Sequence, residues 1–561
     1  MRGKVARASD VPVDQVDFGF SENNLIRSWS DASTIEDAQL AVVKESHPIV
    51  HWMKPLDNLI ATAHQLLDPP LPPRSLQSSI LPAYIEDLPY LQPEDAQYLA
   101  VKGAFTLPDT TLRNELLNTF VHNVYPYVPL LDLNTFLQSI ADNDGRQRVS
   151  LLLFHAVMFS STAFIEPEHL HRAGYASRKA LRKEFFQKAR VLYDFDVETN
   201  RVVVIQAVLL MTYWHETPDD PKNFRYWMEI ALSFAMPTIK YISNRETETT
   251  SHRLWKRLWW CLYTRDRLVS LNLRRPAIIS DHDFDVPALT IEDFEIRPFP
   301  EHTIQMLGNW PILRSTRPQV QLAQMFIAKA HLCTIISDLV VAQTASPTDN
   351  SSALLPNYTQ QLEDWYAGLP PDLQYTNPPS QNLSKVEKTL FAYRAWLKLL
   401  VLNASSAIPR RRSAQKSIPP STEETEALLS ERQVQASMRA IALVAEELHR
   451  VNAIHYLPTT TVGLLLPVLA IHVLNIRAGS PDLWAIGFQS FYQCMRVLDK
   501  LGEVYMLAES MAAYFETAIC NYDGVKGEGG GVSTPQLLEE VLTSAELKCF
   551  VHIVRQEKKV E

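Results

Sequence analysis

The stretch that decides the fold runs from residue 252 to residue 285 and reads HRLWKRLWWCLYTRDRLVSLNLRRPAIISDHDFD. Its apolar residues recur every three or four positions, which predicts a long amphipathic helix over 252–273. Trp255 and Trp259 are four residues apart, so we expect both on the same side of that helix. Pro276 ends the helix because proline has no backbone N–H to donate, and an extended loop with spaced aspartates follows.

Charged residues interrupt the apolar face of this helix. Asp266 lies between Arg265 and Arg267. A buried carboxylate without a partner is costly, so we expect Asp266 to be paired if the helix is buried. We predict that the junction between the helix and its exit loop is held, in a structural role, by Trp255, Trp259, Asp266 and Arg275.

Composition describes an ordinary globular chain. The chain has 561 residues, of which 46% are hydrophobic and 21% charged, enough for a large buried core. Sixteen glycines are few for a nucleotide-binding α/β fold, which uses glycine in its tight turns. Five cysteines exclude a disulfide scaffold, and we expect them to be reduced and buried. A net charge of −10 excludes a globally basic nucleic-acid binder.

Three regions follow one another along the chain. Residues 1–95 form an acidic, proline-rich leader, predicted to be partly disordered, with one short helix near 38–44. Residues 1–100 hold 7 Lys and Arg against 14 Asp and Glu, which is most of the excess negative charge. Residues 96–521 form an all-α domain, and 522–561 contain a glycine-rich break and a C-terminal helix over 537–554.

Helical periodicity recurs through the central region. No convincing run of alternating strands is present, so the predicted fold class is all-α. The apolar run 462–471 is shorter than the ~20 residues of a membrane span, so we expect a buried helix and no membrane contact. The other predicted helices cover residues 112–125, 132–140 with Asp132 as N-cap, 150–164, 177–193, 201–214, 223–235, 319–341, 358–367, 384–403, 423–451, 460–477, 481–501 and 504–519.

Motifs that would carry chemistry are weak. Asp281, Asp283 and Asp285 are spaced like calcium ligands, but Val286 stands where such a loop needs glycine, so a solvated turn is favoured. The pair Asp219–Asp220 suggests a prenyl-diphosphate cyclase but lacks the final acid, and capping of the next helix explains it better. We name no catalytic, cofactor-binding or metal-binding residue.

A basic cluster lies in a serine- and proline-rich loop near residue 410. Arg410, Arg411 and Arg412 are consecutive there. Such a run is typical of a nuclear import signal or a nucleic-acid contact, and equally of a solvated loop. These interpretations stay open at this point.

The 252–287 pattern closely resembles the regulatory, or middle homology, domain of fungal zinc-cluster transcription factors. That family has an R-R-x-W-W motif, a later D-R-x-x-S and R-P, and then an I-x-D-x-D-x-D-V-P loop. The matching residues are Arg257, Trp259, Trp260, Asp266, Arg267, Ser270, Arg275, Pro276, Ile279, Asp281, Asp283, Asp285, Val286 and Pro287.

Other segments match the family in the expected order. Residues 116–136 resemble its opening segment, and 201–214 followed by 227–235 resemble its tryptophan-bearing helical pair. Trp365 and Pro370 belong to an L-x-x-W-x-x-x-L-P-x-x-L segment. The resemblance covers about 110–520 and is nearest to the cutinase and acetamidase regulators. One departure is Met236-Pro237-Thr238, where the family has Gly-Leu-His at a turn.

The resemblance implies a nuclear regulator of metabolic genes, with dimerisation or binding of a small-molecule effector. The family's DNA-binding module needs six closely spaced cysteines and two zinc ions, whereas the first cysteine here is Cys261. We therefore expect no cofactor in this chain and contact with DNA only indirectly or through a missing module. Three hypotheses remain: a regulator whose DNA-binding exon was lost in gene prediction, a truncated modulator of a full-length partner, and an all-α prenyl-diphosphate enzyme.

Overall fold

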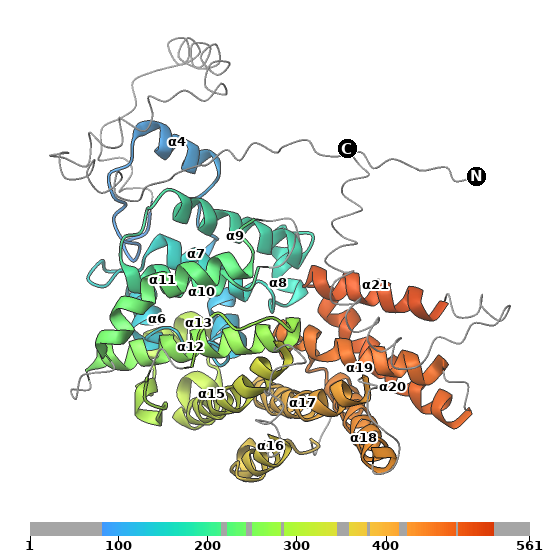
Figure 1. Cartoon of the computed structure of the whole chain (residues 1–561). Coiled ribbons are helices and arrows are strands. Elements are labelled where there is room, and N and C mark those ends of the chain that lie inside the picture. Colours follow the sequence, from blue (N-terminus) through green and yellow to red (C-terminus); the bar gives the residue numbers. More distant parts are fainter. Residues whose placement is uncertain are drawn as a thin grey trace, which may run out of the picture. The chain divides into compact units, whose positions relative to one another are not determined.

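The computed structural model describes residues 81–214, 221–242, 249–281, 285–344, 358–378, 382–414, 423–477 and 481–520 (Figure 1). The chain divides after Gln77, and Ser78–Glu561 forms one compact unit. The predicted helices at 38–44 and 537–554, the Asp219–Asp220 pair and Asp283 lie outside the described residues.

Helices make up the described part of the unit, which confirms the all-α prediction. Within these ranges β pairing is limited to one isolated parallel bridge between Ile85 and Val149. The helices are α4 Pro93–Val101, α5 Thr110–Thr119, the π-helix η1 Phe120–Val124, α6 Leu133–Asp142, α7 Leu151–Ser161, α8 Pro167–Arg172, α9 Arg178–Asp194, α10 Arg201–Met211, α11 Phe224–Ile242, α12 Thr250–Leu273, η2 Ile291–Phe294, α13 Glu301–Leu307, α14 Pro311–Arg314, α15 Thr316–Thr344, α16 Tyr358–Ala367, η4 Pro371–Leu373, α17 Lys385–Ala414, α18 Glu423–Arg450, η5 Ile454–Tyr456, α19 Thr460–Arg477, α20 Pro481–Gly502 and α21 Met506–Cys520.

Side-chain caps fix where several of these helices begin. Asp132 accepts the backbone N–H of Thr135 at 3.2 Å and its hydroxyl at 2.6 Å, so Asp132 caps α6 as predicted. Asn223 caps α11 by accepting the N–H of Arg225 at 2.9 Å. The cap of α11 is thus Asn223 and not the preceding aspartates named from the sequence.

Helix α11 continues past the end expected at residue 235. It runs through Pro237 to Ile242, although a proline inside a helix removes one backbone hydrogen bond. Ile239 is buried and lines a small pocket with Trp255 and Trp259. Burial of this further turn favours the helix. Helix α11 is therefore continuous through Pro237, at the place where the family has a turn.

Helix α17 also continues further than expected, to Ala414. The basic cluster at residues 410–412 therefore lies in the last turns of a helix, and the loop expected there is wrong. Ala404 and Ala407 are buried, which extends the packed side of the helix past residue 403. Alanine and arginine are also strong helix formers, so the helix propagates through the cluster.

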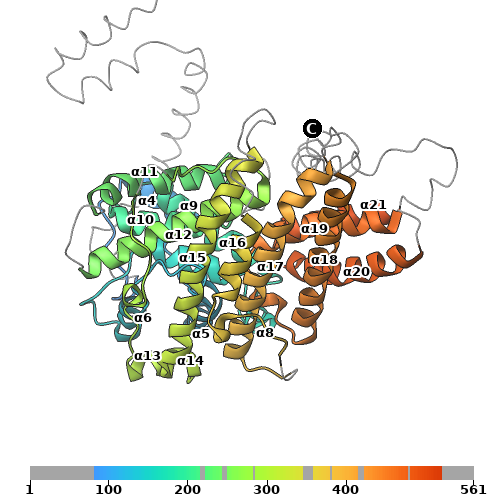
Figure 2. The same ribbon diagram turned by 60° about the horizontal axis from the view of Figure 1, so that its bottom comes forward.

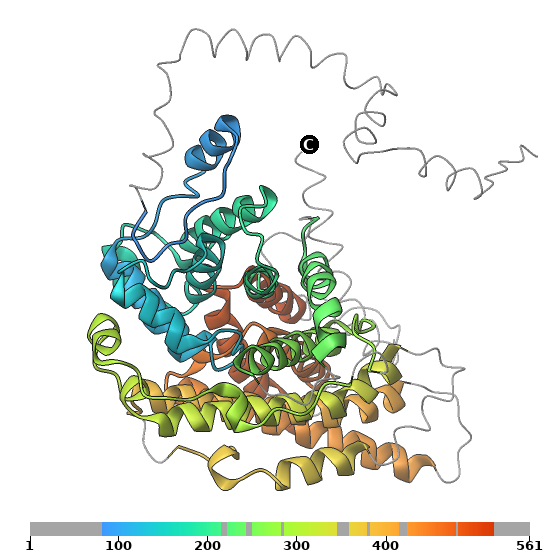
Figure 3. The same ribbon diagram turned by 90° about the vertical axis from the view of Figure 1, so that its left-hand side faces the viewer.

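Three long helices form a layer that organises the core. Helices α15, α17 and α18 lie side by side (Figure 2), and the green and blue helices pack against one side of this layer (Figure 3). Helix α15 is the one described helix long and apolar enough to span a membrane by length and composition. Most of its apolar window is buried inside the unit, as expected for a core helix.

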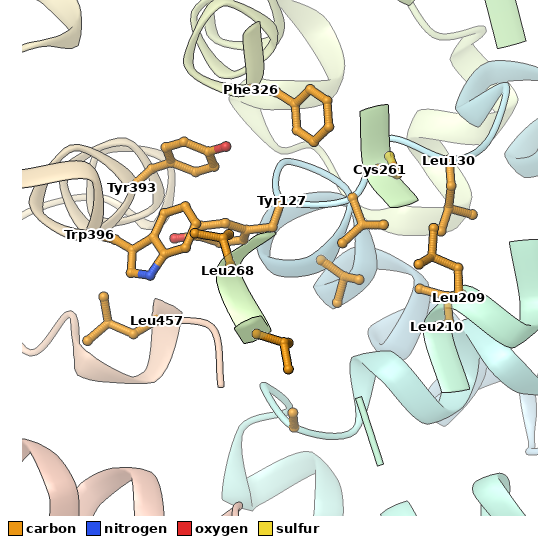
Figure 4. Close-up of a cluster of buried hydrophobic side chains, with 14 of the residues drawn as sticks. Tyr127, Leu130, Leu209, Leu210, Cys261, Leu268, Phe326, Tyr393, Trp396 and Leu457 are labelled. Carbon is orange, nitrogen blue, oxygen red and sulfur yellow. The ribbon is translucent and has the colours of Figure 1, made fainter. Parts of the chain in front are cut away.

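The centre of the core joins residues that are far apart in the sequence (Figure 4). Tyr127 stacks on Tyr393 of α17 with ring centroids 4.4 Å apart and lies edge-on to Trp396 at 5.3 Å. Leu268 of α12 and Phe326 of α15 face the same cluster. Helix α12 is therefore placed at the middle of the core, where its polar residues need partners.

Candidate functional site

The site is the junction between α12 and the loop that leaves it. Asp266 is fully buried, and its carboxylate accepts the backbone N–H of Ile278 at 3.1 Å and of Ile279 at 3.0 Å. Arg267 Nη1 lies 2.7 Å from Asp266 Oδ2, which confirms the predicted pairing. Burial raises the pKa of Asp266, and the two N–H groups and Arg267 oppose that rise.

Arg267 connects the helix to the loop and to α15. Its Nε donates to Ser337 Oγ at 2.8 Å, and its Nη2 donates to Ile279 O at 2.8 Å and to Asp281 Oδ1 at 2.6 Å. The guanidinium also lies over the ring of Tyr263, 4.4 Å from the centroid. One buried side chain therefore fixes three separate segments, which a planar five-donor group is suited to do.

Asp281 is a partner in this junction and not a freely solvated carboxylate. It accepts hydrogen bonds from Tyr263 Oη at 2.8 Å and from Ser337 Oγ. Partial burial disfavours its charged form, but the bonds from Ser337, Tyr263 and Arg267 outweigh this and lower its pKa. Asp281 and Asp285 are both exposed, as expected of a solvated turn, but Asp281 is also held by these three bonds.

Three further charged side chains of α12 are buried as well. Lys256 pairs with Asp293 at 2.8 Å, and Arg257 donates to the carbonyl oxygen of Leu131 at 3.1 Å. Arg265 donates to Thr212 O at 2.8 Å. The helix predicted over 252–273 is confirmed, but every residue from Trp255 to Leu271 is buried, so its expected solvent-facing polar side is wrong. The helix tolerates burial all round because each of these charged side chains has an internal partner.

The tryptophans hold the far end of the loop. Trp255 and Trp259 line one small pocket with Ile239, which confirms that they share a side of the helix. Val286 and Pro287 complete that pocket, and Trp260 Nε1 donates to Pro287 O at 3.0 Å. The exit loop is thus fixed at both ends, by Asp266 with Arg267 at its start and by the tryptophans at its finish.

Other residues singled out from the sequence lie apart from this network. The side chains of Arg275 and Pro276 are exposed, and Arg275 contributes a backbone N–H to Ser270 O at 3.1 Å. Trp365 is buried on α16, a helix that contacts α15 and α17. Pro370 accepts the N–H of Leu373 at 2.8 Å in the following turn. Within the network, Arg267 links helix and loop.

Sequence reasoning missed the contribution of α15. Lys329 is buried, donates from Nζ to Tyr127 O at 2.7 Å, and lies over the Phe326 ring. Burial lowers the pKa of Lys329 to about 8, and raises the pKa of Cys261 and Cys333 to about 12, so both thiols are unreactive. The available signal was a single lysine inside the apolar run of that helix.

The described residues offer little for catalysis. Across the described ranges no group of three or more His, Cys, Asp or Glu side chains is arranged to hold a metal. A shallow, mainly apolar pocket is lined among others by Tyr125, Phe294, Arg297 and Leu322. Such a surface suits a binding role better than acid–base chemistry.

Comparison with known proteins identifies the family. Residues 117–398 match the fungal specific transcription factor domain, and the chain belongs to that family. It is 37% identical over 467 residues to cutinase transcription factor 1 beta of Fusarium vanettenii, covering 78% of this chain and 53% of that relative. It is 31% identical to transcription factor cpaR of Aspergillus oryzae, covering 79% of this chain and 77% of the relative.

A more distant similarity covers part of the chain. The acetamidase regulatory protein of Aspergillus fumigatus is 32% identical over 197 residues, which are 34% of this chain and 24% of that protein. The chain spans about half the length of the cutinase factor and of a further Fusarium transcription factor that it matches. The named relatives are transcription factors and regulators, not enzymes, which agrees with the predicted class.

Proposed function

We propose that the described domain is the regulatory part of a fungal transcription regulator that acts in the nucleus on genes of a metabolic pathway. The observation that carries this proposal is the match over 117–398. That range contains α12, its exit loop and the α15 residues that hold them. A buried, fully paired junction suits a domain that must hold one arrangement until a ligand or partner favours another.

A reporter assay tests the proposal. The full chain is fused to an unrelated DNA-binding domain and expressed in a filamentous fungus with a matching promoter. We expect the fusion to change transcription at least threefold, and Arg267→Lys to alter that change while Asp285→Asn leaves it intact. A fusion that is expressed, nuclear and without effect on the reporter contradicts the proposal.

We propose that contact with DNA is made by residues outside this sequence. The sequence has no cysteine before Cys261, so the family's zinc cluster is not encoded in it. We propose that DNA is reached either through a module encoded upstream or through a full-length partner with which this chain pairs. Translation of the upstream genomic sequence distinguishes the two: a frame with six closely spaced cysteines supports the first, and its absence supports the second.

Nuclear entry is proposed to use the basic cluster at residues 410–412. A fluorescent fusion of the full chain should accumulate in nuclei, and replacement of all three arginines by glutamine should lower the nuclear-to-cytoplasmic ratio severalfold. Replacement of Arg146 and Arg148, which lie in an exposed turn, serves as the control for loss of positive charge. An unchanged ratio removes the cluster from this role.

A small-molecule effector is proposed to bind in the pocket beside Tyr125 and Phe294. That pocket is walled by the π-helix region, the 294–299 loop and α15, so an occupant would contact segments that the α12 network also touches. A ligand at 100 times its Kd should stabilise the protein by about 2.7 kcal/mol. A thermal-shift screen of small organic acids and amides, repeated with Leu322→Trp to fill the pocket, tests this.

An enzymatic role remains the weaker alternative. An all-α prenyl-diphosphate enzyme needs converging carboxylates to hold magnesium. Magnesium-dependent turnover of a prenyl diphosphate by the purified chain would favour that alternative over regulation.

A further inference from the structure

A second recess in the unit is lined mainly by polar side chains from helices and turns far apart in the sequence. Glu115 and Asn118 belong to α5, His122 to η1, Lys385 to the first turn of α17 and His455 to η5. None of these residues lines the pocket proposed above for an effector. The recess is therefore separate from that pocket and differs from it in chemistry.

Two hydrogen-bond acceptors in the wall of the recess have no partner among the described residues. They are Nε2 of His122, a residue that is 3% exposed, and Oδ1 of Asn118, which is 2% exposed. Nδ1 of His122 lies 2.9 Å from the backbone oxygen of Asn118, which can only accept, so Nδ1 carries the proton and Nε2 keeps its lone pair. Burial lowers the pKa of His122 to about 4, which keeps the ring neutral. A buried acceptor without a donor is costly, so both atoms favour a ligand that donates.

The backbone is irregular at the same place. Helix α5 passes into the π-helix η1, in which the N–H of Tyr125 donates to the carbonyl oxygen of Phe120 at 2.9 Å, five residues back. All residues of η1 are buried, so the core and not solvent holds this wider turn. Such turns are rare and occur frequently at functional sites. The irregular turn and the unpartnered acceptors are independent observations, and both point to this recess.

The charges around the recess favour a cationic group. Glu115 and Glu166 contribute two carboxylates, whereas the ammonium of Lys385 lies over the ring of Trp310, 4.7 Å from its centroid. Burial lowers the pKa of His455, so this ring adds no charge near pH 7. No three His, Cys, Asp or Glu side chains within the described part of the chain are arranged to hold a metal, so an organic cation fits better than a metal ion.

We propose that this recess binds the ammonium group of a small primary amine. A primary ammonium has three N–H donors, which match His122 Nε2, Asn118 Oδ1 and one carboxylate of the recess. A water molecule has two donors and no charge, so it pairs the acceptors without offsetting the carboxylates. Phe164 and Tyr456 line the same recess and offer apolar surface to the hydrocarbon part of the amine. This inference does not depend on the proposed regulatory function.

Nitrogen NMR of the full chain, isotope-labelled at histidine, tests the proposal with n-propylammonium chloride as the probe. A donor that reaches the lone pair moves the Nε2 resonance of His122, which is assigned by its loss in His122→Gln. We expect a saturable shift with n-propylammonium and none with tetramethylammonium, which has the same charge but no N–H. Equal shifts with both ions, or no shift with either, overturn the proposal, the second result showing that solvent alone fills the recess.

Substitutions in the recess test how the ammonium is held. Asn118→Leu, and separately the pair Glu115→Gln and Glu166→Gln, should each weaken the binding of n-propylammonium at least fivefold. The pair Glu94→Gln and Glu168→Gln removes the same charge at exposed positions outside the recess and should leave binding unchanged. The glutamine pair keeps the size of both side chains, so it remains informative if Asn118→Leu does not fold. An unchanged Kd in the pair Glu115→Gln and Glu166→Gln overturns the proposal.

A lysine peptide distinguishes a free amine from a side chain of a partner protein. An N-acetylated pentapeptide with one lysine between glycines carries the same primary ammonium on a chain. We expect this peptide to bind no more than tenfold more tightly than n-propylammonium, since the contacts argued above are made by the ammonium and its alkyl chain. Tighter binding of the peptide overturns the assignment to a small amine and gives the recess to a protein partner.

Discussion

Arg267 in the last third of α12 donates from Nε to the hydroxyl of Ser337 in the last third of α15, at 2.8 Å, although 70 residues separate them along the chain. The same guanidinium holds Asp266 at 2.7 Å and Asp281 at 2.6 Å. The junction is thus a charge network of two carboxylates around one arginine, closed from the other side by α15. Removal of any member leaves another buried polar group without its partner.

Asp266→Ala should be among the most destabilising substitutions in the chain. It leaves the N–H groups of Ile278 and Ile279 unpaired and removes a counter-charge from buried Arg267. We expect a loss of about 3–5 kcal/mol in the free energy of unfolding, measured by urea denaturation. The exposed Asp285, replaced by Asn, should change stability by no more than about 0.5 kcal/mol. A loss below 1 kcal/mol for Asp266→Ala would contradict the description of the junction.

Arg267→Lys should cost about 2–3 kcal/mol even though the charge is kept. A lysine ammonium cannot reach Ser337, Ile279 O and Asp281 with the fixed geometry of a guanidinium. Ser337→Ala should cost less in the lysine background than in the natural chain, with a coupling of about 0.5–1 kcal/mol in a double-mutant cycle. Arg275→Lys, at an exposed position, is the matched control. Additive costs would show that Arg267 and Ser337 do not act together.

Most helices and several caps could be predicted from the sequence because they depend on local patterns. The bounds of α16 and α19 match the apolar periodicity, and Asp132 caps α6 as predicted. The errors occur where burial overrides a local signal. Helix α11 passes Pro237 because Ile239 packs against α12, and α17 passes residue 403 because Ala404 and Ala407 are buried.

The site was only partly predictable for a related reason. Pairing of Asp266 followed from the cost of a buried charge, but the residue that pairs with it could be any of several nearby arginines. The participation of Ser337 and Lys329 depends on how α15 lies against α12, which is tertiary information absent from local periodicity. The same gap made α12 look amphipathic, since burial of Lys256, Arg257 and Arg265 depends on partners elsewhere in the chain.

Lys329 should give the protein a stability that rises with pH in the alkaline range. Its pKa is about 8 when folded, against 10.5 in the unfolded chain, so between these values the unfolded chain binds more protons. The free energy of unfolding contributed by this group therefore rises with pH, by about 2 kcal/mol between pH 8 and 9.5. Lys329→Met removes this slope. The free energy of unfolding of both proteins is measured with urea at several pH values. The difference between them reports the titration of Lys329, because the titration of the tyrosines is common to both proteins.

If the difference in the free energy of unfolding between the natural protein and Lys329→Met stays constant from pH 7 to 9.5, the predicted role of Lys329 is contradicted. Lys398→Met provides a control, because that lysine is only partly buried and its ammonium lies over the ring of Tyr366. Burial lowers the pKa of Lys398 as well, but solvent screening should make its slope with pH much smaller.

Buried neutral histidines should make the domain sensitive to mild acid. His155 Nε2 lies 2.9 Å from Ala104 O, and burial, assisted by Lys188, lowers the pKa of His155 to about 3. The pKa values of His122 and His472 are lowered to about 4, again mainly by burial. In the unfolded chain these groups titrate near 6.5, so below that pH the unfolded state binds more protons and stability falls as pH falls. Each histidine contributes about 1.4 kcal/mol per pH unit between 6.5 and its folded pKa.

His155→Gln should therefore make the free energy of unfolding fall less steeply as the pH is lowered. The slope that the three histidines produce together should decrease by about a third, because glutamine does not titrate and its amide can still donate to Ala104 O. Urea unfolding between pH 4.5 and 6.5 measures the slope, and His302→Gln at a half-exposed position tests for general effects of histidine loss. Equal slopes for the natural protein and His155→Gln would mean that His155 becomes protonated in the folded state at these pH values. That result would require water to reach the core beside Phe185 and Ala104, where the structure has the imidazole packed against protein atoms.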